Sequence, residues 1–503
     1  MPQFNLTDIT DIYWASNEGF KGGRDPLGIQ NSSVATYSKL LPGLTNLTGH
    51  IRYYSLYCWL LDEYDKLENK GACSVHQYNF IRRAELAMAL LMKDEGVRSV
   101  VGALFVSQGD YNYVDEGVYN LADGADFDSK KKYWSFMSGA FGQYYLGSLV
   151  YYELVKIEER RFYLCLDGKN LAVAFRKSID DKVRDLFIEC LCNGRMAEAD
   201  FEVLSPLALN NIVVGSEEWN ALNDLLIRED KNGSNLRQQS IFLFLRDIDR
   251  GVSVDEFSHN RFLCLKEDLK WEAARGWYFY YLCEALHFCI ETIFCLILNR
   301  IDNLNSPSID ELLEDIQKEI LPIIKKPSRK VEELRFSIGE KIDIILEGLK
   351  DSVNEKEYAL ASTKAIILML SIYTEFEKNR DSIMNFESSN GLTRQRGILS
   401  EGLNSYVVRY LELSIQEYIK TVVLQIMQEH VIVAVGKMGN SNSDLRKFII
   451  EDGRLFLVEI RYPTNTRPRI DSLFNFLQDL GYLNQEGQLT QLAYDFIDTY
   501  GKE

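Results

Sequence analysis

The sequence predicts a mainly α protein, a helical bundle with winged-helix-like modules near residues 140–187 and at the C-terminus, and with little β structure. Proline is scarce, with 9 residues in 503, so few helix interiors are interrupted. Apolar residues recur at helical spacing through long segments. Hydrophobic residues make up 46% of the chain and charged residues 26%, which is typical of a folded globular protein with several domains.

The first predicted domain covers residues 1–190 and is helical. Leu41-Pro42-Gly43 separates two helical segments, because proline and glycine both interrupt helices. The second segment, Thr45–Leu67, is apolar on several faces and must be buried on more than one side. We therefore expect Tyr53, Tyr54 and Trp59 to anchor this segment in the core or in a partner protein, and they are the candidate partner-binding residues.

A short pattern of a helix end, a turn and a second helix occurs twice in the chain. One copy lies at residues 153–175, with its turn at Asp167-Gly168, and the other at residues 479–496, with its turn at Glu486-Gly487. This order is typical of the back half of a winged helix-turn-helix, in which the turn is the tip of the wing. Two unrelated helix–hairpin–helix pieces are the alternative interpretation.

A second helical domain is predicted at residues 191–305, and its last helix, Trp271–Arg300, is strongly apolar. Glu284, His287 and Glu291 interrupt the apolar run, and each ionised carboxylate would cost roughly 2.5–3.5 kcal/mol at a bilayer centre. We therefore predict a buried core helix. His287 is expected to be a hydrogen-bonded core histidine, because no second Glu-x-x-His motif completes a di-iron site.

Two further domains complete the predicted organisation. Residues 306–390 are predicted to form a long helical hairpin, because Ser328–Val353 and Asn354–Asn385 read as two long helices joined by a short connection. Residues 391–503 are predicted to form an α/β winged-helix-like domain. Its long helix is expected at Leu403–His430, followed by strand-like runs at Val431–Val435, Lys447–Ile450 and Leu455–Ile460.

The cysteines and the N-terminal residues both favour the cytoplasm. The 9 cysteines lie mostly inside apolar runs, which indicates reduced, buried thiols. Residues Met1–Asp11 contain neither the basic nor the apolar part of a secretory signal. We therefore expect a cytoplasmic protein.

Motifs of the common catalytic chemistries are missing from the sequence. Gly436-Lys437 lacks the upstream glycine and the hydroxyl residue of a phosphate-binding loop, and no Gly-x-Ser-x-Gly motif occurs. The 5 histidines leave few candidate bases. We expect no catalytic residue, no cofactor and no metal ion, so a non-enzymatic role is favoured.

Basic residues gather near the C-terminus of a chain whose net charge is −18. They flank the predicted strands and the start of the last module, where a bound duplex would place its phosphates. The candidate DNA-binding residues, expected to bind duplex DNA weakly and without sequence preference, are Arg446, Lys447, Arg454, Arg461, Arg467 and Arg469. A solvated face of mixed charge is the alternative.

The same region contains Asp452 and Glu459-Ile460-Arg461, which resembles the D…E-x-K signature of restriction-type nucleases with arginine in place of lysine. An extended chain between Asp452 and Glu459 would place the two carboxylates roughly 20 Å apart. One metal ion cannot bridge that distance, so another acid would have to substitute. A DNA-binding or DNA-cleaving effector that uses this region is therefore the alternative function.

Three N-terminal stretches resemble bacterial proteins encoded in anti-phage defence operons of the Lamassu-like kind. They are Asp25-Pro26-Leu27-Gly28-Ile29-Gln30, the run Leu40–Leu44 and the run Ile51–Leu60, and the resemblance covers about the first 100 residues. It implies a non-enzymatic bridging or regulatory subunit of an anti-phage or anti-plasmid complex. The implied partners are an SMC-type ATPase and a nuclease effector.

Overall fold

The computed structural model describes residues 25–93, 99–108, 114–115, 117–230, 233–325, 327–393, 395, 397–438 and 445–502. Helices make up 64% of it and strands 6%, which confirms the mainly α class. The chain forms two compact units, each assembled from segments far apart in the sequence. Unit 1 contains the chain up to Lys39 and Ser258–Thr466, and unit 2 contains Leu40–Phe257 and Arg467–Glu503. The four consecutive domains expected from the sequence stay a prediction.

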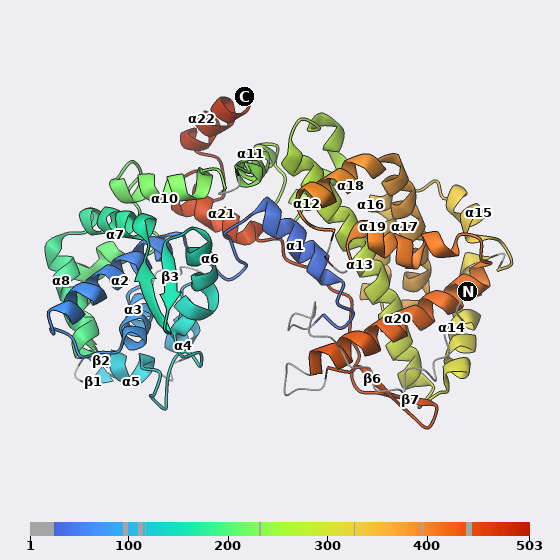
Figure 1. Ribbon diagram of the computed structural model, residues 1–503, viewed down its shortest axis with the longest axis horizontal. Coiled ribbons are helices and arrows are strands. Elements are labelled where there is room, and N and C mark those ends of the chain that lie inside the picture. The colour runs from blue at the N-terminus through green and yellow to red at the C-terminus, as the bar shows by residue number, and fades with distance from the viewer. Residues whose placement is uncertain are drawn as a thin grey trace. The chain divides into compact units, whose positions relative to one another are not determined.

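Unit 2 is built around α2 (Arg52–Asn69), which packs along α7 (Leu166–Ser178) (Figure 1). Helix α10 (Glu217–Ile227) also packs on α7. The other helices of this unit are α3 (Gln77–Leu91), α4 (Ala103–Ser107), α5 (Leu121–Ala125), α6 (Leu146–Tyr151), α8 (Asp181–Asn193), α9 (Phe201–Leu204), α11 (Leu236–Asp249), α21 (Ile470–Asp479) and α22 (Gln491–Tyr500).

Unit 1 is organised around α13 (Glu272–Asn303), which packs most extensively on α17 (Tyr358–Lys378) (Figure 1). Most of α13 is buried because it is apolar on every face. The other helices of this unit are α1 (Gln30–Leu40, whose last residue belongs to unit 2), α12 (Phe257–Leu263, whose first residue belongs to unit 2), α14 (Ile309–Ile324), α15 (Val331–Phe336), α16 (Ile342–Asn354), α18 (Arg380–Ser389), α19 (Leu399–Tyr406) and α20 (Ile415–Met438).

The described strands form three small antiparallel sheets. One has three strands in the order β1-β2-β5, and the other two are the hairpins β3–β4 and β6–β7. The strands are β1 (Val114–Asp115), β2 (Val118–Asn120), β3 (Val155–Glu158), β4 (Arg161–Leu164), β5 (Arg195–Ala197), β6 (Phe448–Glu451) and β7 (Arg454–Leu457).

The first predicted module contains a hairpin between two helices, but its turn is not where the sequence placed it. The turn lies at Glu159 and Arg160, both with positive φ, and Asp167-Gly168 belongs to α7. A Cβ atom at Gly168 would lie 2.1 Å from the carbonyl oxygen of Leu154. This glycine therefore serves the close packing of α7 and not a turn.

The second module agrees with the expected order of elements. Helix α21 is followed by a turn with Gly487 at φ 78°, by an isolated bridge between Leu483 and Leu489, and then by α22. A winged helix is not established by these elements in either module, and it stays a prediction.

Three local predictions are wrong. Val431–Val435 lies inside α20, because packing that buries Val433 and Ala434 overrides the strand preference of β-branched residues. Ser328–Val353 is two helices, α15 and α16, separated around Gly339. The expected helix Leu403–His430 is likewise divided between α19 and α20.

Three helices among the described residues are long and apolar enough to cross a membrane by length and composition: Glu272–Asn303, Tyr358–Lys378 and Ile415–Lys437. In the most apolar window of each, 94%, 67% and 50% of the residues are buried inside the protein. The apolar part of Glu272–Asn303 is therefore almost completely buried, which agrees with the prediction of a buried core helix.

Candidate anion-binding site

Tyr53, Tyr54 and Trp59 lie in the core of unit 2, where each is 0% exposed. The hydroxyl of Tyr53 accepts a hydrogen bond from the backbone N–H of Val101 at 3.0 Å. The indole of Trp59 stacks on Phe175 with a centroid distance of 5.1 Å. Of the two outcomes expected from the sequence, burial favours the core. Their assignment as partner contacts stays a prediction.

The six candidate DNA-binding residues are divided between the two units. Arg446, Lys447, Arg454 and Arg461 belong to unit 1, whereas Arg467 and Arg469 belong to unit 2. Arg469 has a structural role there, since its guanidinium donates to the carbonyl oxygen of Leu41 at 3.1 Å and its backbone, with φ 64°, begins α21.

Arg454 lies at the start of β7, beside the tight turn of the β6–β7 hairpin. Its guanidinium donates to the carbonyl oxygen of Ser306 at 2.9 Å and lies 3.8 Å from the carboxylate of Glu311. Because the Arg454 side chain is 56% exposed, this ion pair contributes little stability.

Lys447 and Arg461 lie at one pocket, together with Lys437, which the sequence did not single out. The pocket has a volume of about 390 Å³. It is lined by Asp25, Pro26, Val433, Ala434, Lys437, Leu445, Lys447, Glu459 and Arg461. Its basic residues come from the end of α20, from the residue before β6 and from the segment after β7.

A buried histidine connects two of the residues that line this pocket, Pro26 and Lys447. His430, in α20 and 0% exposed, lies with Nδ1 2.9 Å from the carbonyl oxygen of Pro26, while its Nε2 accepts the backbone N–H of Lys447 at 2.8 Å. This pair of bonds assigns the proton to Nδ1. The ring packs between Phe294 and Phe448, so the backbone on either side of the pocket is held by one rigid side chain.

Asp25 also lines the pocket and lies five residues before the start of α1. One carboxylate oxygen accepts the N–H groups of Leu27 and Gly28, at 3.1 and 2.8 Å, and the other accepts the N–H of Gln30 at 2.8 Å. Its carbonyl oxygen accepts a hydrogen bond from Nζ of Lys437. The Asp25-Pro26-Leu27-Gly28-Ile29-Gln30 stretch is therefore a helix start that also anchors the end of α20.

The pocket has an excess of positive charge. Lys447 is paired with Glu459, and the carboxylate of Asp25 is occupied by backbone N–H groups. Arg461 donates to Oγ1 of Thr464 at 3.3 Å, and among the described residues its buried Nε has no hydrogen-bond partner. One guanidinium and two ammonium groups at the same pocket are suited to a phosphate or carboxylate.

The acidic residues of this region do not form a metal site within the described residues. Asp452 lies in the turn between β6 and β7, with φ 49°. Within the described part of the chain, no group of three His, Cys, Asp or Glu side chains could hold a metal ion. The nuclease interpretation therefore has no preformed cluster to build on in that part.

The polar residues of α13 are hydrogen-bonded inside unit 1. His287 lies within 3.2 Å of Ser32 and Ser33 hydroxyls and 3.1 Å from the carbonyl oxygen of Gly397, which confirms the expected core histidine. Glu291 accepts hydrogen bonds from Gln30 and from the backbone N–H of Thr464. Burial raises the pKa of Glu291 to about 7.

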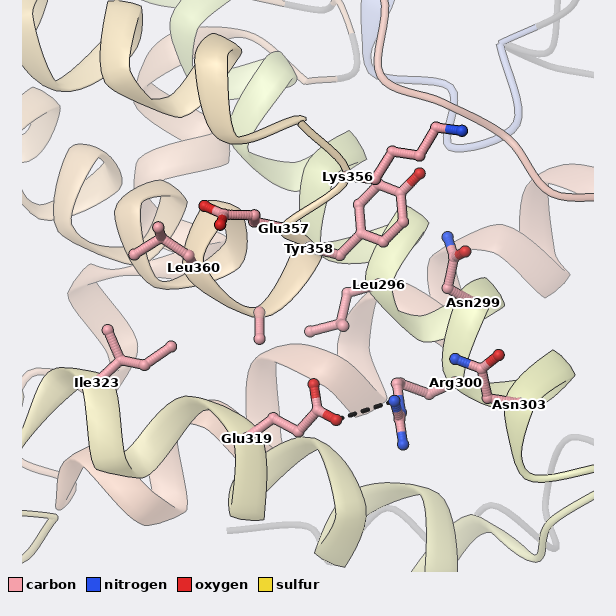
Figure 2. A pocket seen from close by; sticks show the side chains of 11 residues that line it. Leu296, Asn299, Arg300, Asn303, Glu319, Ile323, Lys356, Glu357, Tyr358 and Leu360 are labelled. Atoms are coloured by element: carbon pink, nitrogen blue, oxygen red, sulfur yellow. Dashed lines mark ion pairs between the residues drawn. The ribbon is translucent and has the colours of Figure 1, made fainter. Parts of the chain in front are cut away.

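A larger pocket of about 620 Å³ lies between α13, α14 and the start of α17 (Figure 2). Figure 2 shows Arg300 and Glu319 joined across its floor, with Asn299 and Asn303 on the same side as Arg300. Arg300 lies 2.9 Å from Glu319 and also donates to Asp315 at 2.5 Å. Because two carboxylates neutralise this arginine, the pocket attracts anions less than the one around Lys437.

Comparisons with known proteins identify no relative of this chain. No family model matches it, and neither a curated protein nor a solved structure is significantly similar to it.

Proposed function

We propose that this chain is a cytoplasmic, non-enzymatic bridging or regulatory subunit of a bacterial anti-phage or anti-plasmid defence complex. Its proposed partners are an SMC-type ATPase and a nuclease effector. Two features support the proposal: the resemblance of the N-terminal stretches to defence-operon proteins, and the basic pocket of unit 1, which offers a contact for an anionic partner group.

The convergence of Lys437, Lys447 and Arg461 on one pocket carries the anion-binding part of this proposal. A net charge of −18 opposes attraction of nucleic acid at long range, so any contact must be local and strongly dependent on salt. The phosphate backbone of duplex DNA fits these conditions as a weak ligand without sequence preference.

A test measures the affinity of the protein for a fluorescent duplex at several salt concentrations. We expect a dissociation constant on the order of 10⁻⁶–10⁻⁴ M at physiological salt. Arg461→Glu should weaken binding by about tenfold or more and make the salt dependence shallower, because it removes a phosphate contact and adds a repulsive charge.

Lys318→Glu is the matched control, because Lys318 is 75% exposed on α14, does not line the pocket and undergoes the same change of charge. It should bind duplex like the parent protein. Equal binding by Arg461→Glu and the parent would remove the pocket from the proposal. Both variants should retain the melting temperature of the parent.

The partner proposal is tested by expressing the neighbouring genes of the operon with this chain tagged. Retention of an SMC-type ATPase through size-exclusion chromatography is the expected result, and elution of the chain alone would contradict it.

A DNA-cleaving effector is the second candidate, favoured by the position of Glu459 and Arg461 at the same pocket. Mg²⁺-dependent cleavage of duplex that is lost in Glu459→Gln would establish it in place of the non-enzymatic role.

A further inference from the structure

Two cysteines of unit 2 that are 119 positions apart in the sequence lie side by side. Sγ of Cys73 is 3.0 Å from Sγ of Cys192, and both are free thiols that are partly exposed. Cys73 lies between α2 and α3, and Cys192 lies near the end of α8. The other cysteines of unit 2 include Cys190, which is buried and lies two positions before Cys192 on the same helix.

The backbone on the Cys73 side is held in place by local hydrogen bonds. The N–H groups of Gly71 and Ala72 bond back to the last turn of α2, at 2.9 Å each. On the far side of the cysteine, the hydroxyl of Tyr64 donates to the carbonyl oxygen of Val75 at 3.0 Å. The short connection that carries Cys73 is thus fixed at both ends.

The backbone on the Cys192 side is held by Arg83 of α3. Its guanidinium donates to the carbonyl oxygen of Leu191 at 2.8 Å and makes two hydrogen bonds with Asp126, at 2.7 and 2.6 Å. Gly194, in the left-handed region with φ 67°, ends α8 directly afterwards, and a Cβ atom there would lie 2.8 Å from that of Ala122. Both thiols are therefore positioned by structure that is present before any bond forms between them.

We propose that Cys73 and Cys192 are a modification site, a thiol pair that forms a reversible disulfide by exchange with a small-molecule disulfide of the glutathione class. Two thiols held in contact on separate fixed elements exchange far faster than free thiols in solution, because the second step is intramolecular.

The exchange proceeds in two balanced steps. Cys73 loses its proton to solvent, and its thiolate attacks one sulfur of the small disulfide, whose S–S bond breaks and releases one thiolate that takes up a proton. Cys192 then attacks the Cys73 sulfur, gives its proton to the departing thiolate and releases a second small thiol. Two protein thiols are oxidised, and one small disulfide is reduced to two thiols.

The order of attack follows from the surroundings of Cys192. Burial, followed by the hydrogen bond with Cys73, raises the pKa of the Cys192 thiol, and its S–H donates to Sγ of Cys73. Cys192 therefore acts second, when Cys73 already carries the mixed disulfide beside it.

The test incubates the full-length protein in glutathione buffers from reducing to oxidising and counts free thiols after denaturation. The parent protein should lose two thiols together, and a tryptic digest should contain a Cys73–Cys192 cross-linked peptide that disappears on treatment with dithiothreitol. Cys190→Ser is the matched control and should show the same loss.

Cys73→Ser and Cys192→Ser should yield no internal disulfide, and the thiol that remains should at most carry one glutathione. Retention of all thiols by the parent protein in the oxidising buffers would overturn the proposal, as would a cross-linked peptide between other cysteines. Intact mass of the native parent protein is a second measurement, which needs no variant to fold.

Discussion

At the scale of single residues, the buried carboxyl group of Glu291 has specific hydrogen-bond partners, and burial shifts its protonation. Glu291 on α13 is 1% exposed and faces Gln30, Thr464, Asp25 and His287. Desolvation is the largest influence on its pKa, followed by the hydrogen bond from Thr464, which opposes it. Such a carboxyl group couples folding to pH.

We predict that Glu291 lowers stability as pH rises. Its pKa is raised from 4.5 to about 7, so the folded protein retains a proton that the unfolded chain has lost. The stability this provides is complete below about pH 4.5 and is lost as pH rises through about 7. Glu291→Gln, which resembles the protonated form, should therefore be more stable than the parent at pH 8, by at most about 3 kcal/mol.

The measurement is urea unfolding of both proteins at pH 5 and pH 8. The two free energies of unfolding should approach each other at pH 5. Glu314→Gln is the control, because Glu314 is 73% exposed on α14 and should show no such change. A difference between parent and Glu291→Gln that is the same at both pH values would contradict the predicted titration.

A second residue-scale prediction concerns Trp59. Its side chain is 0% exposed and stacks on Phe175 and Phe187, so Trp59→Ala should lower the free energy of unfolding by about 3–5 kcal/mol. Thermal or urea unfolding measures this change. An unchanged unfolding curve with loss of complex assembly would instead return this residue to the partner-binding role.

At the scale of elements, α7 approaches Leu154, the residue before β3, so closely that we predict the opposite of what helix propensity alone would give. Alanine normally stabilises a helix relative to glycine, by up to about 1 kcal/mol. At Gly168 a Cβ atom would lie 2.1 Å from the carbonyl oxygen of Leu154, which itself accepts the N–H of Cys165. Gly168→Ala should therefore destabilise the protein by about 1–3 kcal/mol.

Gly147→Ala is the matched control in α6, where a Cβ atom would meet nothing within 4 Å. It should leave the melting temperature unchanged or raise it. If both alanine variants behaved alike, the close approach of α7 to Leu154 would not determine the stability at Gly168.

The sequence predicted some elements correctly and others wrongly, for a physical reason. Long runs of apolar residues predicted α2 and α13, because helices that are apolar on several faces must be buried. Local patterns failed at Val431–Val435 and at Asp167-Gly168, where contacts with residues distant in sequence decide the conformation. Composition predicts a strand at the first and a turn at the second, but packing in the folded unit overrides both.

The candidate site was partly predictable for the same reason. Lys447 and Arg461 are in a basic stretch that is visible in the sequence. The role of Asp25 depends on an interaction with Lys437 across 412 positions, and that of His430 depends on Pro26 across 404. No local pattern encodes such long-range contacts, so these residues could be found only from the fold.

At the scale of the whole molecule, unit 2 is assembled from two segments that are far apart in the sequence. We therefore predict that its last segment is not an independent domain. Residues 467–503 belong to unit 2, and α21 contributes Leu473, Phe476 and Leu477, each 0% exposed. The carboxylate of Asp479 accepts the backbone N–H of Ile51 at 3.0 Å and lies 3.1 Å from the ring of His50. The indole N–H of Trp219 donates a hydrogen bond to the carbonyl oxygen of Leu480 at 2.8 Å.

Truncation after Thr466 should therefore expose an apolar face on the rest of unit 2 and leave polar groups such as the N–H of Ile51 without their partners. We expect the truncated protein to show rapid proteolysis and fast amide exchange in α2 and α10, while α13 and α17 stay protected. Hydrogen exchange measured by mass spectrometry distinguishes the helices. If instead residues 391–503 fold alone and the truncated chain keeps its protection in α2, the C-terminal region is a separate domain, as its sequence pattern suggested, and the contacts of Asp479 do not hold unit 2 together.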